Sequence, residues 1–214
     1  MADEKKIWFL NDALSSLIAA KTAKFNESID MSLNLTCGAK NTISQLRGVI
    51  SLPYGTGKNK KVAVIAKANE WDAAKVAGAD YVGDDELLQD IAVGKIEYDC
   101  YIATPSMMSS IAKVAKILGP KGLMPNTKSG TVTTNFASVV PAIKQGTMVE
   151  YKADKKGVIN MCFGNVLIDV DKLAKNLQSA LSAILNNKPS DVDKMEIKSI
   201  FISSTMGKSY RIKL

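Results

Sequence analysis

Residues 118–132 read Leu-Gly-Pro-Lys-Gly-Leu-Met-Pro-Asn-Thr-Lys-Ser-Gly-Thr-Val. The glycines and prolines in this stretch exclude a continuous helix or a central strand. It nevertheless keeps the apolar residues Leu118, Leu123 and Met124, which a flexible linker has no reason to carry. The sequence therefore predicts a shaped loop that is packed by its own side chains and carries Lys121 and Lys128 at its tip.

The segment before this loop alternates between strand and helix patterns. Val62 to Ala66 form a short continuous apolar run, which is typical of a strand covered on both faces. Further patterns follow in order: a helix over 72–77, a strand at 81–82, a helix capped near Asp84 or Asp85, a strand over 98–104 and a helix opened by Pro105. This alternation predicts a Rossmann-like parallel α/β domain.

Such folds often bind nucleotides, but the sequence lacks the glycine fingerprints of nucleotide sites. No Gly-x-Gly-x-x-Gly is present, and the stretch 55–59 (Gly-Thr-Gly-Lys-Asn) is an incomplete phosphate loop. Leu52 stands where the first glycine belongs, and Asn59 replaces the hydroxyl residue that would hold magnesium. We therefore predict no nucleotide cofactor.

The two ends of the chain mix strand and helix patterns. Residues 28–36 alternate strictly between apolar and polar, which predicts a half-buried strand. The remaining predictions are a helix over 11–21, a hairpin of 148–152 and 158–163 around the turn 154–157, an amphipathic helix over 173–185, and strands at 197–202 and 210–212. Both ends are expected to form one discontinuous α+β domain, residues 1–66 with 152–214, into which an α/β domain of residues 67–151 is inserted.

Charge follows this predicted division. Residues 1–66 and 152–214 together carry a net charge of +9, whereas residues 67–151 carry −2. A basic domain beside a mildly acidic one favours a polyanion as the partner of the basic domain. The alternative, that these lysines are ordinary solvated surface, stays open on charge alone.

The composition excludes several classes of site. The chain has no histidine, which removes the commonest general base and most zinc sites. Cys37, Cys100 and Cys162 are widely spaced and suggest neither a disulfide framework nor a metal site. No secretory signal or membrane-spanning run is recognisable, so we expect a cytoplasmic protein with no membrane partner, no cofactor and no catalytic residue.

Several motifs resemble, in order, those of the L-one family of large-subunit ribosomal proteins. The stretch 118–132 is similar to the family's signature loop, with Lys121 in place of the usual arginine and Thr127 in place of proline. Thr22 to Phe25 followed by Glu27, and Ser-Thr-Met-Gly at 204–207, resemble two further motifs. The resemblance implies a split basic domain with an inserted domain on two hinge strands, and it covers the chain from about Asn11 onward.

The turn at 204–207 is the main candidate for RNA contact. The Thr205 hydroxyl can bond a phosphate or a ribose 2′-OH, Met206 offers an apolar surface, and Gly207 allows close approach of the backbone. Taken without the resemblance, an ordinary hairpin turn is the simpler interpretation. We predict RNA contacts at the following positions: Lys24, Phe25, Glu27, Lys40, Lys155, Ser204, Thr205, Met206 and Gly207. Lys24 and Phe25 pair a phosphate-binding cation with a stacking ring, although a core position is the simpler interpretation of Phe25 alone. The resemblance implies the contacts of Glu27 and of the turn, whereas Lys40 and Lys155 are ordinary phosphate candidates. The signature-loop residues that it singles out are Gly119, Pro120, Lys121, Gly122, Met124, Pro125, Asn126 and Lys128.

Three departures from the family pattern predict weaker RNA binding. Asn41 and Asn165 stand where family members often carry a basic residue, and the common basic N-terminal extension is missing. Each lost phosphate contact should lower affinity and flatten its dependence on salt.

The resemblance implies a structural ribosomal protein, monomeric when free. It would bind the lateral-stalk region of large-subunit rRNA, assist release of deacylated tRNA from the exit site, and repress translation of its own operon by binding the mRNA. Two alternatives stay open at this point. One is a nonspecific basic RNA-binding protein, and the other is a phosphometabolite enzyme that uses the α/β insert.

Overall fold

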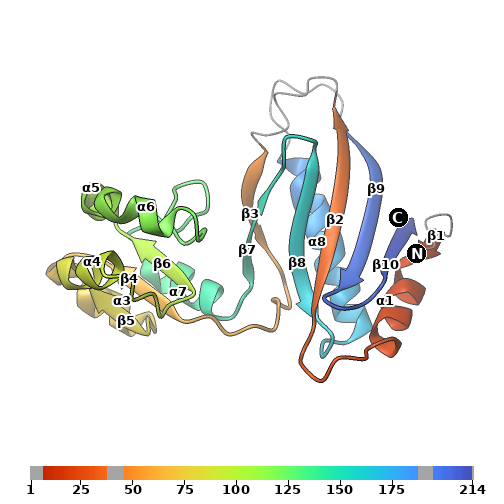
Figure 1. Ribbon diagram of the computed structural model, residues 1–214, viewed down its shortest axis with the longest axis horizontal. Coiled ribbons are helices and arrows are strands. Elements are labelled where there is room, and N and C mark those ends of the chain that lie inside the picture. The colour runs from red at the N-terminus through yellow and green to blue at the C-terminus, as the bar shows by residue number, and fades with distance from the viewer. Residues whose placement is uncertain (1–6, 38–45, 188–194, 214) are drawn as a thin grey trace. The chain divides into compact units, whose positions relative to one another are not determined.

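The computed structural model describes residues 7–37, 46–187 and 195–213, and the chain divides into two compact units (Figure 1). The first unit comprises Met1–Gly57 and Thr147–Leu214, and the second comprises Lys58–Gly146. Each unit contains a hydrophobic cluster of its own. The mixed class of sheets and helices predicted from the sequence is confirmed.

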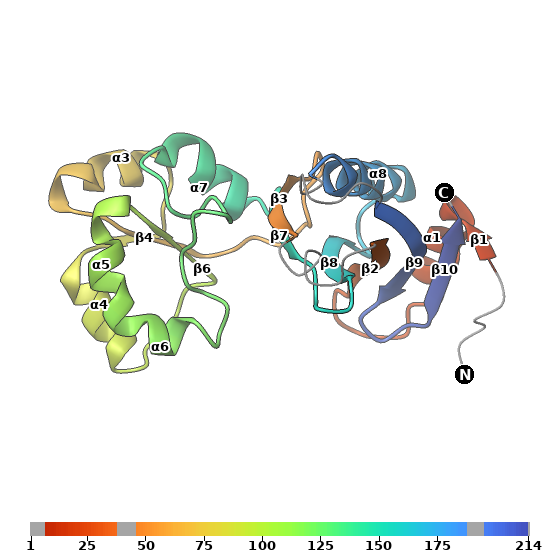
Figure 2. The same cartoon turned by 90° about the horizontal axis from the view of Figure 1, so that it is seen from above.

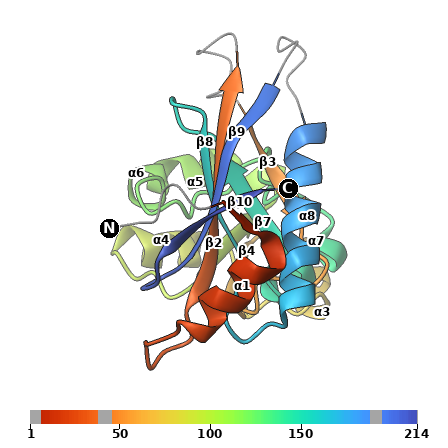
Figure 3. The same ribbon diagram turned by 90° about the vertical axis from the view of Figure 1, so that its right-hand side faces the viewer.

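The first unit is built on a five-stranded sheet. Its strand order is β1 (Ile7–Phe9), β10 (Ser209–Lys213), β9 (Met195–Ser204), β2 (Ser28–Cys37) and β8 (Val158–Asn165). Strand β1 runs parallel to β10, and the other neighbours are antiparallel. Helices α1 (Leu10–Ala19) and α8 (Val170–Asn186) contact each other and lie on one side of these strands (Figure 3).

The alternation in β2 decides which face of the sheet is buried. Ile29, Met31, Leu33 and Leu35 are buried, as the sequence predicts, and they join the cluster that contains the apolar stripe of α8. The polar residues between them face the other side, which no described helix of this unit covers. We call this side, formed by strands β1, β10, β9, β2 and β8, the open face.

The predicted hairpin of 148–152 and 158–163 is only partly correct. Gly157 adopts a φ of 82° and its N–H donates to the Asp154 carbonyl over 2.9 Å, so the turn is present. The strands then separate, because β7 (Met148–Lys152) pairs with β3 (Arg47–Ser51) while β8 pairs with β2. Tyr151 of β7 thereby enters the core.

The second unit has a three-stranded parallel sheet. Strand β4 (Val62–Ile65) lies between β5 (Tyr81–Gly83) and β6 (Cys100–Ala103) and is fully buried, as its apolar run predicts. Helices α3 (Trp71–Val76) and α7 (Phe136–Lys144) lie on one side of the sheet (Figure 2). The other side carries α4 (Asp85–Ala92), α5 (Met108–Ile111) and α6 (Ala115–Leu118).

Short 3₁₀ segments complete the second unit: η1 (Ala68–Glu70), η2 (Pro105–Met107) and η3 (Ala112–Val114). The single helix expected after Pro105 is therefore a succession of 3₁₀ and α turns. These turns bury Met107, Ile111, Val114 and Leu118 on one side.

The boundaries between the units differ from the predicted ones. They fall at 57/58 and 146/147 rather than 66/67 and 151/152, because β4 pairs inside the second unit and β7 inside the first. Lys58, Lys60 and Lys61 consequently belong to the second unit.

The charge of the two units differs from the prediction. The first unit has 17 Lys/Arg against 12 Asp/Glu, a net charge of +5, and the second has 11 against 9, a net charge of +2. Charge alone does not distinguish the units.

Candidate nucleic-acid interface

The turn between β9 and β10 is bound to the start of β2. The Thr205 N–H donates to the Ser28 carbonyl over 3.2 Å, and the Ser28 N–H donates to the Thr205 hydroxyl over 3.2 Å. The Thr205 hydroxyl in turn lies 3.4 Å from the Ser28 carbonyl. The Met206 N–H donates to the Glu27 carboxylate over 3.1 Å. The turn 204–207 and the segment before β2 are therefore one structure.

Glu27 is a buried anion beneath this turn, with 1% of its surface exposed. The Ser204 hydroxyl, the Met206 N–H, the Ala23 backbone and the nearby Lys21 charge lower the pKa of Glu27 below its ordinary value of 4.5. Burial acts in the opposite direction but is outweighed, because the hydrogen bonds favour the charged form. Glu27 and Ser204 thus face inward and hold the turn in place.

Gly207 has a packing reason to be glycine. A Cβ atom at this position would lie 2.4 Å from the Ser204 hydroxyl oxygen, which real Cβ atoms do not tolerate. A larger residue would therefore displace the hydroxyl that donates to Glu27. Glycine is therefore needed at this position to keep the Ser204 hydroxyl in place beneath the turn, as well as to let a ligand approach the backbone.

Five residues of the candidate site remain accessible to solvent at this end of the sheet. Met206 is 68% exposed and Phe25 is 51% exposed, and Lys24, Thr205 and Gly207 are exposed too. They provide a cation, a ring, a thioether and a hydroxyl, a combination suited to phosphate, sugar and base contacts. We call the set of Lys24, Phe25, Thr205, Met206 and Gly207 the turn surface.

Lys155 lies away from the turn surface. It is exposed on the turn after β7, three residues before Val158, and Val158 pairs with Asn34 of β2. The turn surface lies at the opposite end of β2, beside Ser28. At about 3.4 Å per residue, the six residues from Ser28 to Asn34 separate the two places by about 20 Å. Lys40 and Asn41 lie outside the described residues.

Asn165 does not stand in a solvent-facing position. Its side chain is buried, its Nδ2 donates to the Gly57 carbonyl over 3.3 Å, and its Oδ1 accepts from the Leu167 N–H over 3.1 Å. The family pattern predicts a lost phosphate contact at this position. The structure assigns it to holding two loops together.

Asn176 is a structural residue that the sequence reasoning missed. It is fully buried on α8, accepts from the Tyr54 N–H, and donates to the carbonyls of Gly55 and Phe163. These bonds fix the segment that follows β3. The signal was available, because an asparagine between Leu173 and Leu177 interrupts an otherwise apolar helix stripe.

The signature loop of the second unit has the packed form that the sequence predicts. Leu118 is fully buried and Leu123 packs against the same cluster, while Lys121 and Lys128 are exposed. Asn126 organises the loop: its side chain accepts from the Lys128 N–H over 2.9 Å, and its backbone bonds Thr131. The other singled-out positions divide between exposed Gly119, Pro120, Gly122 and Met124 and buried Pro125.

Glu27 gives the protein a predictable response to acid. Because its pKa in the folded state is lowered, its contribution to stability is full above about pH 4.5 and is lost as the pH falls through the lowered folded-state value. Glu27→Gln keeps the hydrogen-bonding shape but removes the charge. We expect the stability difference between wild type and Glu27→Gln to shrink as pH falls from 7 to 3, measured by urea unfolding. A difference that does not change with pH would contradict the role of the carboxylate.

Comparison with known proteins identifies the family. The model of the ribosomal protein L1p/L10e family matches residues 17–208. Large ribosomal subunit protein uL1 of Orientia tsutsugamushi (strain Boryong) is 41% identical over 212 residues, which cover 99% of this chain and 85% of that protein. The uL1 protein of Wolbachia pipientis wMel is 44% identical over 200 residues, covering 93% and 92%. Protein uL1c of Trieres chinensis is 42% identical over 205 residues, covering 96% and 89%.

The chain belongs to the ribosomal protein L1p/L10e family. The resemblance drawn from its motifs is confirmed, and the family is one of structural ribosomal proteins rather than enzymes. Among the described residues, no helix is long and apolar enough to cross a membrane. In the same part of the chain, no three His, Cys, Asp or Glu side chains gather as a metal site.

Proposed function

We propose that this protein is a structural component of the large ribosomal subunit that binds rRNA through the turn surface. Family membership and the names of the relatives support the ribosomal assignment. The observation that supports this position for the rRNA-binding site is the exposed turn 205–207, which is held by a hydrogen bond to the buried Glu27 carboxylate. A preformed surface loses little conformational entropy on binding, which favours affinity.

Each part of this surface has a distinct role in the proposal. Lys24 neutralises a phosphate, and Phe25 stacks on an unpaired base or packs on a sugar. The backbone and hydroxyl of the turn contact ribose, and Met206 packs against the apolar edge of a sugar or base. Glu27 and Ser204 position the turn without contacting RNA, and Lys155 contacts a different part of the RNA because it lies at the other end of β8.

The finer assignment is part of the same proposal. The RNA is the lateral-stalk region of the large-subunit rRNA, and the second unit moves with the stalk as deacylated tRNA leaves the exit site. The same surface binds the mRNA of the protein's own operon and represses its translation. The protein acts in the cytoplasm and is a monomer when free. These expectations rest on the resemblance of the motifs at 22–27, 118–132 and 204–207.

Competition between RNAs tests the proposal. The full chain should bind a stalk-rRNA fragment in the presence of excess bulk RNA, and it should remain on large ribosomal subunits through high-salt washes. If bulk RNA competed for the protein as effectively as unlabelled stalk RNA does, the protein would instead be a nonspecific basic RNA-binding protein. An mRNA leader that competes with the stalk fragment would support the repressor role, and one that fails to compete would remove it.

A further inference from the structure

The sheet of the first unit opens at a place away from the turn surface. Ile200 and Ile212 form the last pair between β9 and β10, and beyond them β10 ends at Lys213 while β9 is still paired to β2. A depression of about 320 Å³ lies there, lined by Lys198, Ser199, Arg211 and Lys213 together with four isoleucines. None of the residues that line this depression belongs to the turn surface.

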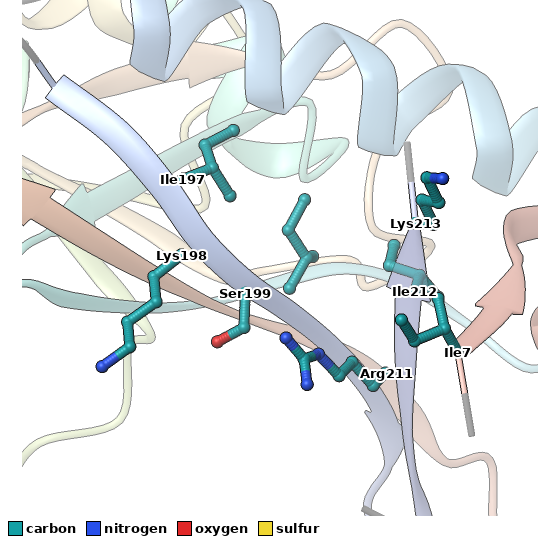
Figure 4. A pocket seen from close by; sticks show the side chains of 8 residues that line it. Ile7, Ile197, Lys198, Ser199, Arg211, Ile212 and Lys213 are labelled. Carbon is teal, nitrogen blue, oxygen red and sulfur yellow. The ribbon is translucent and has the colours of Figure 1, made fainter. Parts of the chain in front are cut away.

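A β-bulge sets the position of Lys198. Ser199 pairs with Asn34 and Ile197 pairs with Leu35, so Lys198 is an extra residue with no partner on β2. Bulges of this kind redirect a side chain out of the regular alternation. In Figure 4 the Lys198 side chain extends from β9 on the same side as the Ser199 hydroxyl.

Arg211 reaches this place from the neighbouring strand. It pairs with Phe201, and the next residue, Ile212, is buried toward the helices, so Arg211 stands on the open face. Figure 4 shows its guanidinium extending toward Ser199, whereas Lys213 extends away from them. Neither Lys198 nor Arg211 forms an ion pair with another described residue.

We propose that Lys198, Ser199 and Arg211 form a subsite for backbone phosphates of the RNA that the turn surface engages. The proposal rests on the function proposed above and extends it. Arginine presents a planar fork that binds a phosphate through two parallel hydrogen bonds, lysine adds a point charge, and the serine hydroxyl can donate a further hydrogen bond. Two cations that form no ion pair with the described residues, placed around an open depression, suit a polyanion.

The distances suit one continuous RNA backbone. Phe201, opposite Arg211, lies three residues from Ser204, and Lys198 lies six, which correspond to about 10 Å and 20 Å along the strand. Such spans cover several consecutive phosphates. Asp30 is exposed on β2 opposite Ser203. Because its carboxylate repels phosphates, the RNA backbone should follow the β9–β10 side of the open face.

Salt dependence of binding by the full chain tests this subsite. For Lys198→Gln/Arg211→Gln, the slope of log affinity against log salt should lose about 1.4 to 1.8 units, since each phosphate contact contributes about 0.7 to 0.9. Affinity at 0.1 M salt should fall by roughly tenfold or more for stalk and unrelated RNA alike, because phosphate contacts position rather than specify. Arg211→Lys keeps the charge, so it should retain the slope while losing affinity.

The control removes the same charge elsewhere on the unit. Lys172 and Lys175 are exposed on α8, which packs on the covered side of the sheet, and Lys172→Gln/Lys175→Gln should leave the slope near that of wild type. A wild-type slope in the first double variant, or an equal loss in the control, would overturn the subsite while leaving the turn surface intact. Absence of RNA binding by wild type would overturn the proposed function, and the subsite with it.

Discussion

Asn165→Lys is expected to destabilise the protein, although the family pattern suggests that a basic residue here should strengthen RNA binding. The substitution leaves the Gly57 carbonyl and the Leu167 N–H without their partner, at about 1–3 kcal/mol for each group that stays buried. It also forces an ammonium group out of a site that is 4% exposed. We expect a loss of about 2–5 kcal/mol in the free energy of unfolding, measured by urea denaturation.

Asn160→Lys provides the matched control. Asn160 is exposed on the same strand, so the same change there should leave stability within about 0.5 kcal/mol of wild type. If Asn165→Lys were as stable as wild type and bound RNA more tightly with a steeper salt slope, its side chain would face solvent and RNA. That result would contradict the inward position of Asn165.

Met206→Asp is expected to cause the largest loss of RNA affinity with the fold intact. The side chain is 68% exposed, and its hydrogen bond to Glu27 uses the backbone N–H, which the substitution keeps. A carboxylate there removes an apolar contact and repels nearby phosphates. We expect affinity for stalk RNA to fall by about 30- to 150-fold, which corresponds to about 2–3 kcal/mol, with unchanged thermal unfolding.

Two comparisons make this prediction specific. Val76→Asp places the same charge change at an exposed position of the second unit and should leave affinity near that of wild type. Thr205→Val is a less specific test, because the Thr205 hydroxyl accepts from the Ser28 N–H and supports the turn. Wild-type affinity for Met206→Asp would remove the turn from the RNA interface.

Patterns within a single segment predicted the local structure well. The alternation of β2 and the apolar run of β4 both appear where the sequence places them, because each depends on residues that are neighbours in the chain. The packed form of the signature loop is also visible in advance, since Leu118 and Leu123 sit among glycines and prolines. The sequence analysis missed strands β1 and β3, neither of which alternates between apolar and polar residues.

The sequence by itself determined the family, the mixed fold class and the segments that carry the candidate site. Tertiary structure decided how the residues at and near that site are placed: Glu27 and Ser204 lie beneath the turn, Asn165 faces inward, and Lys155 lies at the other end of β8 from the turn surface. It also separated β7 from β8 and moved Lys58, Lys60 and Lys61 into the second unit. The physical reason is the same in each case, because these outcomes depend on hydrogen bonds between residues far apart in the chain. Glu27 and Met206 are 179 residues apart, and no local pattern of either segment contains the other.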